Sequence, residues 1–508
     1  MGGLFGYVGA GKKDLLKNTL RVLFHRGGDT WGIAYLDGKR LEIRHYDKNH
    51  KPTSSDLRMF ILQTSWEKKK REAFPKSNGN YALAFYGVLY NEADLMELPE
   101  KNTIRAIREI IPQLQGRWAF LLLQPKEKRI YFAKNRIPLY IGVGRRAFYI
   151  SSDLATVLQH TNEVVIPSDL SYGYFSSPPG LTLFGGYKKK IFKQTEQRAP
   201  KYYYEKEMME QPNVLLETLK VRIKKAIPFL DDPDVVGSGS SYHNAQFLAR
   251  LFNGRGLYPC EYKPRSNNLV VFSQSGETVD SLKAVSKALE EDVNVLLITN
   301  NPYSTLAQKA HYTIGLNVGP EVSVLSTKGF TAANLLSLRL YAETTEKSLK
   351  PELNKVPDVI EDLLTTRYKP IWRKIVDYDV VFTSAADYLP IMGEFAYRTM
   401  VLGQKPAAVL PAAEIKHSAI ALNPKTTLFV ALNPSSQEYE HVEDILNDLE
   451  KKIIISDING DIPLPNAHPL IQVIYGGVVM EVLAYKLARY LKTDPDNPER
   501  MARGIMVE

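Results

Sequence analysis

The stretch that decides the fold runs from Leu269 to Leu289. It consists of an apolar run, a hydroxyl-rich turn and an amphipathic segment, which read Leu269-Val270-Val271-Phe272, Ser273-Gln274-Ser275-Gly276-Glu277-Thr278 and Val279 to Leu289. This order predicts a strand, a turn and a helix. Such a turn presents backbone N–H groups and hydroxyls at a helix N-terminus, where the helix dipole favours an anion.

The same construction occurs about 30 residues earlier. There Val235-Val236 lead into Gly237-Ser238-Gly239-Ser240-Ser241, and a helical pattern follows from Tyr242 to Phe252. Turns that follow adjacent parallel strands face one crevice. The sequence therefore predicts a crevice that binds a phosphate group carried by a small molecule.

Length and composition indicate an ordinary globular protein of about three domains. The chain has 508 residues, of which 44% are hydrophobic and 24% charged. Because no apolar run approaches 18 residues and the N-terminus lacks the regions of a signal peptide, we expect no membrane span and a cytoplasmic location. The single cysteine, Cys260, excludes an intrachain disulfide framework and a cysteine-based metal cluster. No metal site and no cofactor are expected.

The chain carries a net charge of +9, with basic runs at Lys68–Arg71 and Lys188–Lys190. Such runs are found in nucleic-acid patches but also in solvated turns. We favour the solvated turns because neither run is interleaved with aromatic residues. We therefore expect neither nucleic acid nor a membrane as a partner.

The pattern of predicted elements changes near residue 195. Before it, short alternating or apolar runs predict antiparallel β-structure with a few helices, one of them over Thr103 to Leu114. A lysine- and tyrosine-rich segment, Phe192 to Tyr204, is typical of a linker. After it, strands alternate with longer helices, which predicts parallel, doubly wound sheets.

The C-terminal part contains two series of predicted strands that indicate a duplicated unit. They lie at Val235, Leu269, Val293–Thr299 and Tyr312–Leu316, and then at Val380–Thr383, Thr427–Leu432 and Ile453–Ser456. In the second series Ala385-Ala386 replace the glycines that a phosphate turn would need. We expect the first half to hold the ligand and the second to support it.

Seven ordered signatures carry a family resemblance over nearly the whole chain. They are Phe5 to Gly9, Arg26 to Asp29, Glu207 to Pro212, Gly239 to His243, Ser273 to Thr278, Glu321 to Phe330, and Ala413 to His417 with the tail from Asp494 to Glu508. With these, the chain resembles the glutamine:fructose-6-phosphate amidotransferases, the isomerising enzymes that make glucosamine 6-phosphate.

The resemblance implies an α/β and α+β fold with a particular domain order. It implies an N-terminal-nucleophile (Ntn) hydrolase-like αββα glutaminase domain over 1–195 and a linker over 196–205. Two sugar-isomerase (SIS) domains with doubly wound parallel sheets would follow. The first, over 206–365, would bind the phosphate, and the second, over 366–508, would include the C-terminal tail. It also implies a homodimer that pairs through the SIS domains and takes a hexose or amino-sugar 6-phosphate.

The residues that the resemblance implies for glutamine hydrolysis are altered. The family's catalytic cysteine, which follows the initiator methionine, is Gly2 here, and glycine carries no nucleophile. The arginine that holds the glutamine carboxylate is Ser65, the asparagine of the oxyanion site is Tyr86, and the aspartate that binds the substrate amine is Asn102. Since an oxyanion donor alone is worth ~3 kcal/mol, we expect glutamine hydrolysis to be lost, although Arg26 and Asp29 remain.

The residues that the resemblance implies for sugar-phosphate binding are retained. Polar matches are Ser240, Ser241, Ser273, Gln274, Ser275 and Thr278, and flanking matches are Val324 and Ala502. Their hydroxyls and N–H groups can satisfy several phosphate oxygens. The alternative is that these serines only cap helices. Binding is favoured because six polar matches exceed what two caps need.

The residues implied for the sugar chemistry are only partly retained. His417 matches the histidine that opens the sugar ring, a role that suits a group titrating near neutral pH. The family glutamate sixteen residues earlier falls on Val401, which leaves Glu394 as the candidate base. The imine-forming lysine is Arg503, and Arg398 replaces another lysine. Guanidinium cannot form an imine but can hold a phosphate.

Two functions remain open from the sequence. The first is a glutamine-independent enzyme that aminates, deaminates or isomerises a hexose phosphate, with His417 and Glu394 as catalytic residues. The second is a non-catalytic sugar-phosphate sensor or a regulatory subunit of an active partner enzyme. Loss of residues at both sites favours the second, whereas the retained C-terminal tail favours the first.

Overall fold

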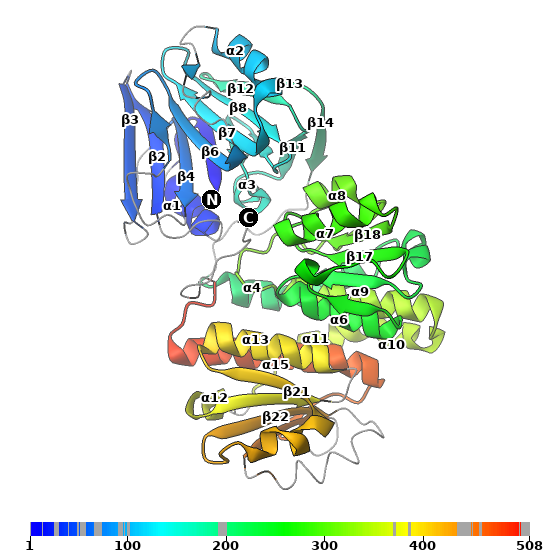
Figure 1. The fold of residues 1–508 in the computed structure, drawn as a ribbon. Coiled ribbons are helices and arrows are strands. Elements are labelled where there is room, and N and C mark those ends of the chain that lie inside the picture. The colour runs from blue at the N-terminus through cyan, green and yellow to red at the C-terminus, as the bar shows by residue number, and fades with distance from the viewer. Residues whose placement is uncertain are drawn as a thin grey trace. The chain divides into compact units, whose positions relative to one another are not determined.

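The computed structural model describes residues 2–12, 14–24, 30–38, 40–47, 50, 57–65, 74–89, 95, 97–98, 102–191, 201–368, 372–384, 388–433, 449, 451–456, 460–496 and 498. The chain divides into two compact units, with the boundary between Ala199 and Pro200. Each unit has its own sheets (Figure 1).

The N-terminal unit contains two antiparallel sheets. The eight-stranded sheet has the order β14-β11-β9-β10-β1-β4-β2-β3, with bounds Tyr187–Ile191, Glu163–Pro167, Tyr140–Gly144, Ala147–Ser151, Leu4–Gly9, Met59–Ser65, Thr30–Asp37 and Arg40–Asp47. The six-stranded sheet has the order β13-β12-β8-β7-β6-β5, with bounds Gly180–Phe184, Tyr172–Ser176, Arg129–Asn135, Gly116–Gln124, Ala82–Leu89 and Lys76–Ser77.

The two sheets pack face to face between two layers of helices. Phe148 of β10 and Phe175 of β12 meet across the sandwich with ring centroids 5.4 Å apart. Apolar residues of α1 (Leu15–Leu23) share a core cluster with one sheet, and those of α2 (Thr103–Ile110) with the other. A further helix, α3 (Leu154–Leu158), packs beside α1. This is the predicted αββα arrangement.

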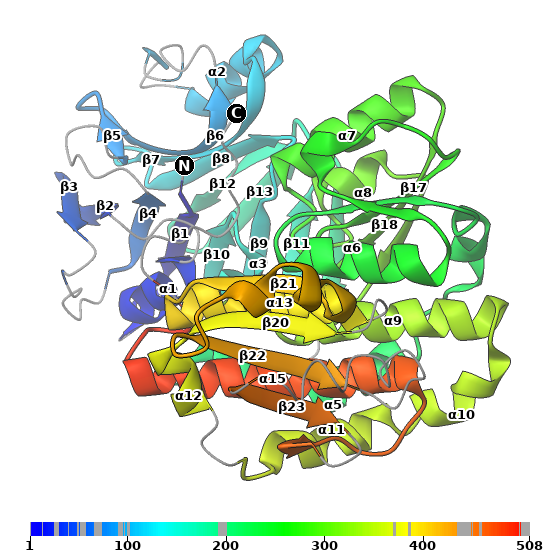
Figure 2. The ribbon, with the colours of Figure 1, turned by 60° about the horizontal axis from the view of Figure 1, so that its bottom comes forward.

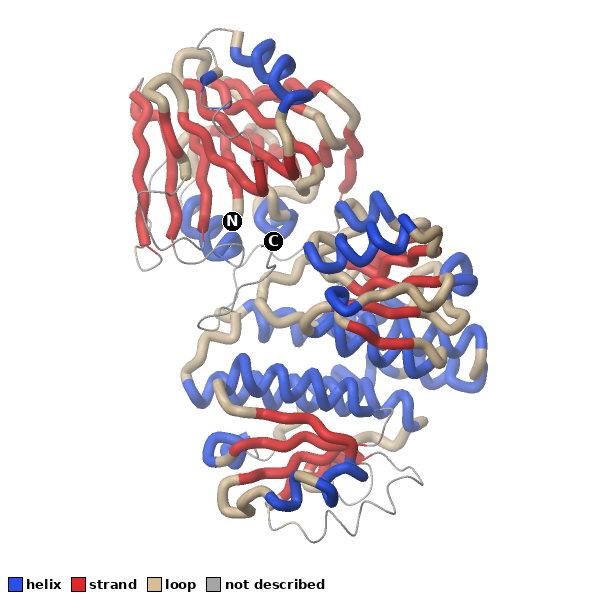
Figure 3. The backbone as a smooth tube through the Cα atoms, in the orientation of Figure 1, coloured by secondary structure: helices blue, strands red, loops and turns tan. Residues whose placement is uncertain are grey.

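The C-terminal unit contains two parallel sheets of five strands. The first has the order β16-β15-β17-β18-β19, with bounds Arg255–Leu257, Asp234–Gly237, Asn268–Phe272, Asn294–Thr299 and Tyr312–Gly315. The second has the order β21-β20-β22-β23-β24, with bounds Ala407–Pro411, Asp379–Ser384, Thr427–Asn433, Lys452–Ser456 and Ile462–Pro463. In both, the first strand along the chain lies second in the sheet, which confirms the predicted duplication (Figure 3).

Helices lie between and around these sheets (Figure 2). Those of the first half are α4 to α11, at Tyr203–Met209, Gln211–Thr218, Ser240–Leu251, Val279–Glu290, Thr305–Lys309, Lys328–Thr344, Lys350–Leu353 and Val356–Thr365. Those of the second half are α12, α13 and α15, at Trp372–Asp377, Leu389–Gly403 and Pro469–Leu491.

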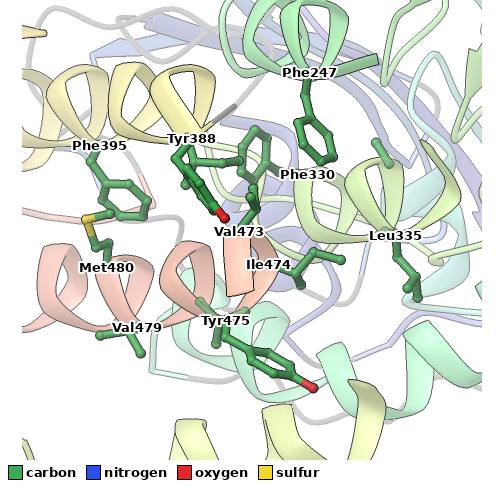
Figure 4. Packing of buried hydrophobic residues seen from close by; sticks show 14 of the residues in the cluster. Phe247, Phe330, Leu335, Tyr388, Phe395, Val473, Ile474, Tyr475, Val479 and Met480 are labelled. Carbon is green, nitrogen blue, oxygen red and sulfur yellow. The ribbon is translucent and has the colours of Figure 1, made fainter. Parts of the chain in front are cut away.

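One hydrophobic core joins the two halves of the C-terminal unit. It includes Phe247 of α6, Leu335 of α9, Phe395 of α13 and Met480 of α15, all buried (Figure 4). Because helices of both halves contribute to the same core, residues of the second half lie close to the turns of the first. The division of this region at residues 365 and 366 stays a prediction.

Three features differ from the expectations. Helix α4 begins at Tyr203, inside the predicted linker, because Tyr203 and Tyr204 are buried. The short strands β16, β21 and β24 were not predicted, since two to five residues give too little pattern. Finally, α15 is long and apolar enough to cross a membrane by length and composition, although no uninterrupted apolar run marks it in the sequence, because Glu481 and Lys486 stand within it. However, 89% of its most apolar stretch is buried inside the protein.

Candidate functional site

The two hydroxyl-rich turns lie side by side, as predicted. Strands β15 and β17 are parallel neighbours, and Gly237 at the end of one is paired with Phe272 at the end of the other. The turns 238–239 and 273–278 therefore leave the sheet at the same edge, and each leads into the N-terminus of a helix of 12 residues. We call these turns with the first residues of α6, Ser240 and Ser241, the serine cradle.

The first turn depends on glycines. Gly239 has φ 59° and ψ −134°, a conformation that a side chain strongly disfavours. At Gly237 a β-carbon would lie 2.2 Å from the carbonyl oxygen of Ser241. Only glycine at both positions lets the chain pass from β15 into α6 so tightly.

The second turn is braced by its own hydroxyls. Ser273 Oγ accepts a hydrogen bond from the Gly276 N–H at 3.1 Å, and Ser275 Oγ accepts one from the Glu277 N–H at 3.2 Å. Gly276 has φ 68°, and a β-carbon there would meet Ser304 Oγ at 1.9 Å. These contacts hold the turn in one shape before any ligand binds.

The cradle hydroxyls do not serve as helix caps. The residues before α6 and α7, Gly239 and Thr278, make no side-chain capping hydrogen bond. In contrast, Ser304 caps α8 by accepting from the Ala307 N–H at 3.3 Å. Ser273, Gly276 and Glu277 are buried, whereas the other cradle residues, including Ser238, Ser240, Ser241, Ser275 and Thr278, are partly or fully exposed. The alternative that the serines merely cap helices is therefore not supported at these two helices.

Glu394 of α13 joins the cradle to the second half of the unit. Its Oε1 accepts a hydrogen bond from Ser240 Oγ at 2.8 Å, and its Oε2 lies 2.8 Å from Nδ1 of His243. Arg398, one turn further along α13, places Nε 2.9 Å from the same Oε1. Glu394 is fully buried. Both carboxylate oxygens are thus occupied, and the Ser240 hydroxyl proton points to Glu394.

Arg398 extends this network toward α4 and α15. It donates hydrogen bonds to the Tyr204 hydroxyl at 2.6 Å and to the Ser326 carbonyl oxygen, and it lies 3.8 Å from Glu481. Burial acts to lower the pKa of Arg398, but Tyr204, Glu394 and Glu481 raise it and prevail. The guanidinium therefore stays charged inside the protein.

Two other buried carboxylates lie near this network. Burial raises the pKa of Glu481 to about 7, although Arg398 and a hydrogen bond from Gln211 at 2.9 Å oppose the rise. Burial, together with the charge of Glu321, raises the pKa of Glu207 to about 7. Glu207 accepts from Ser323 Oγ at 2.6 Å and so anchors the loop that contains Val324.

Three other predicted positions, His417, Val401 and Val324, lie in described parts of the chain. His417 ends the 3₁₀ helix Ala412–His417 and is exposed, and the described residues show no hydrogen bond between it and the cradle. Val401 packs against the hydrophobic core, and Val324 donates its N–H to the Asp496 carbonyl oxygen at 3.2 Å.

Sequence reasoning gave no role to His243 or Tyr397. His243 stands within a quoted signature, so its position was a usable signal, but its partner Glu394 is 151 residues away. Tyr397 lies within a helix without any motif, and only the packing of α13 on α6 brings it to the first turn.

Comparison with known proteins agrees with this geometry. The SIS domain family matches residues 234–342, which include the cradle. The glutamine–fructose-6-phosphate aminotransferase of Pyrobaculum aerophilum is 28% identical, and that of Sulfolobus acidocaldarius is 26% identical, over 100% and 97% of both chains, respectively. The chain is thus similar to these aminotransferases over its whole length, at low identity.

A solved structure supports the fold of the C-terminal unit. The C-terminal domain of the glucosamine-fructose-6-phosphate aminotransferase from Francisella tularensis has a TM-score of 0.52 and 21% identity, and the match covers 60% of this chain and 100% of that one. At this identity the likeness concerns the fold alone.

Gly2, the position where the sequence predicts a missing nucleophile, has no room for a side chain. Gly2 is buried, and a β-carbon there would lie 1.3 Å from the Thr64 carbonyl oxygen. Ser65, the last residue of β4, and Tyr86, within β6, are both buried. Asn102 is exposed, with φ 59°, just before α2. The structure brings Gly2 and Ser65 together but places Asn102 in a helix-starting role.

Several sequence-predicted positions lie outside the described residues. They are Ala502 and Arg503 of the tail, Arg26 and Asp29 of the N-terminal domain, Ala385 and Ala386, and the basic run Lys68–Arg71.

Proposed function

We propose that this protein binds a hexose 6-phosphate in the serine cradle and has lost glutamine hydrolysis. The observation that carries the proposal is the pairing of β15 with β17, which places two hydroxyl-bearing turns and two helix N-termini at one edge of the sheet. Helix N-termini attract anions, and hydroxyls can donate to phosphate oxygens. The aminotransferases to which the chain is related, by their names, act on fructose 6-phosphate.

Loss of glutamine hydrolysis is supported by the N-terminal strand itself. The nucleophile position holds Gly2, and the Thr64 backbone occupies the space that any side chain would need. Without a nucleophile, no covalent acyl intermediate can form. Any nitrogen chemistry would therefore use free ammonia.

The first of the two functions left open by the sequence is a glutamine-independent enzyme. Its reaction would be ammonia-dependent amination, the reverse deamination, or aldose–ketose isomerisation. His417 would open the sugar ring and Glu394 would move protons between carbon atoms. A base must reach the proton it removes. Glu394 would first have to release Ser240 or His243, since both its oxygens are engaged.

The second function is a non-catalytic sugar-phosphate sensor or regulatory subunit. It is favoured by the hydrogen bonds that occupy both carboxylate oxygens of Glu394. A buried carboxylate held by a serine, a histidine and an arginine acts as a structural link between the two halves. Val401 offers no proton-transfer group at the position where the related enzymes are expected to have one.

The assembly that we propose is a cytoplasmic homodimer joined through the SIS domains, without nucleic acid or membrane as partner. His417 is exposed, and Ile420 and Leu422 on the same segment are 50% and 47% exposed. Exposed apolar side chains beside His417, the proposed ring-opening residue, fit a surface that a second subunit covers.

The test measures binding and turnover separately. Purified protein is titrated with fructose 6-phosphate and glucosamine 6-phosphate by calorimetry, and then incubated with fructose 6-phosphate plus ammonium, or with glucosamine 6-phosphate alone. Glutamine replaces ammonium in a parallel reaction. We expect binding of at least one sugar phosphate and no release of glutamate from glutamine.

The outcomes separate the two functions. Turnover that His417→Ala abolishes would exclude the sensor. Binding without turnover would exclude the enzyme. Failure of every hexose phosphate to bind would overturn both.

A further inference from the structure

A hydroxyl from the second half of the C-terminal unit lies at the first turn of the cradle. Helix α13 packs on α6, and it brings Tyr397 to Gly239. The Tyr397 Oη lies 3.7 Å from the point where a β-carbon of Gly239 would stand, and among the described residues no other heavy atom outside the neighbouring ones comes within 4 Å of that point. The phenol therefore borders the same turn that we propose as a phosphate contact.

Tyr397 differs from its neighbours on α13 in its exposure. Ala396 and Arg398 are buried, whereas Tyr397 is only partly buried and Gly239 is exposed. A polar group at the surface of a glycine turn is reachable by a ligand. A tyrosine that served only the core would place its hydroxyl away from the turn or pair it within the protein.

The Tyr397 ring lies next to the ring of His243, which supports its position. Its centroid lies 6.4 Å from that of the His243 ring at an interplanar angle of 54°. His243 is itself held by Glu394 at 2.8 Å. Such support fixes the orientation of a binding group before the ligand arrives, which reduces the entropy lost on binding.

The protonation state of Tyr397 suits a hydrogen-bond donor. Burial, followed by the negative charge of Glu394, raises the pKa of Tyr397 to about 12. The phenol therefore keeps its proton throughout the physiological range.

We propose that Tyr397 is a ligand-binding residue of the serine cradle, and that its hydroxyl donates a hydrogen bond to a phosphate oxygen of the bound hexose phosphate. This inference rests on the proposed function. It makes the site a joint product of both halves, because the turn comes from the first half and the donor from the second. It also gives α13 a direct role in binding, in addition to the role of Glu394 in holding Ser240.

The experiment compares wild type with Tyr397→Phe, which removes one oxygen and keeps the ring. Inorganic phosphate and fructose 6-phosphate are titrated by calorimetry, and thermal unfolding is recorded for each protein. Tyr490→Phe is the matched control, since Tyr490 lies on α15 with 52% of its surface exposed. We expect Tyr397→Phe to lower the affinity for both ligands by about 10- to 100-fold, because a hydrogen bond to a charged group is lost. Tyr490→Phe should bind like wild type.

Three results would overturn the inference. Unchanged affinity of Tyr397→Phe for both ligands would show that the hydroxyl makes no contact, while leaving the proposed function intact. Weaker binding of fructose 6-phosphate alone would show that the hydroxyl meets the sugar and not the phosphate. Absence of binding by wild type would remove the proposed function as well. If Tyr397→Phe unfolds early, Tyr397→Leu is titrated in its place, with the same loss expected.

Discussion

A β-carbon on Gly2 would lie 1.3 Å from the carbonyl oxygen of Thr64, and 2.9 Å from the Cα of Ser65. Non-bonded carbon and oxygen atoms do not approach so closely, so the backbone of β4 at Thr64 occupies the space that a side chain on Gly2 would need. The pairing is reinforced by the Gly3 N–H, which donates to Thr64 Oγ1 at 2.9 Å. A side chain at position 2 therefore needs a rearrangement of the backbone beside it.

Restoring a cysteine at this position is therefore expected to fail. Gly2→Cys should release no glutamate from glutamine, and it should lower the free energy of unfolding by about 1–3 kcal/mol because it overpacks a filled site. Glutamate release and urea unfolding are the measurements. Ala10→Cys, at an exposed position, is the control and should unfold like wild type. Glutamine-dependent turnover by Gly2→Cys would contradict the closed geometry.

Mutation can distinguish a residue that binds the ligand in the cradle from one that caps a helix. Thr278→Ala should weaken binding of fructose 6-phosphate about 10-fold and change stability by less than about 0.5 kcal/mol, because Thr278 makes no side-chain cap. Ser304→Ala removes a cap and should cost about 1 kcal/mol of stability. Calorimetric titration and urea unfolding check the pair. A loss of stability in Thr278→Ala without a loss of binding would restore the capping interpretation.

Truncating Glu394, which forms a buried ion pair with Arg398, should strongly lower the free energy of unfolding. Glu394→Ala leaves Arg398 without its closest carboxylate inside the protein and should cost about 3–5 kcal/mol in the free energy of unfolding. Glu109→Ala breaks an exposed pair with Arg105 on α2 and should cost under about 0.5 kcal/mol. Denaturant unfolding compares the two. Equal costs would mean that the buried network adds little to the native state.

Stability should fall as pH rises from about 4.5 toward neutrality. The pKa of Glu481 is raised to about 7 in the folded protein from an ordinary value of 4.5, so the folded state binds this proton more tightly than the unfolded state. The stability that it contributes is therefore fully present below pH 4.5 and is lost as pH passes 7.

Glu481→Gln isolates this contribution. The amide keeps the shape and can still accept from Gln211, but it does not titrate. The difference in unfolding free energy between pH 4.5 and pH 8 should be smaller in the variant by up to about 3 kcal/mol. Urea unfolding at several pH values measures it. The same pH dependence in both proteins would show that Glu481 is ionised throughout.

Much of the architecture was accessible from the sequence. The apolar runs before Gly237 and Ser273 predicted β15 and β17, and the amphipathic stretch after Thr278 predicted α7. The short strand β16 and the edge strand β21 escaped detection because so few residues carry little periodicity. Helix α15 showed no long uninterrupted apolar run because Glu481 and Lys486 stand within it.

The sequence by itself determined the order of the elements, the duplicated parallel sheet, the hydroxyl-rich turns and the glycine at position 2. Each is a local property, since periodicity, glycine placement and residue type act over a few neighbours. The tertiary structure alone decided that Ser240 and His243 meet Glu394, that Tyr397 reaches Gly239, and that Thr64 fills the space beside Gly2. These contacts join residues that are far apart along the chain, and they follow from how helices and strands pack, which no short stretch of sequence encodes.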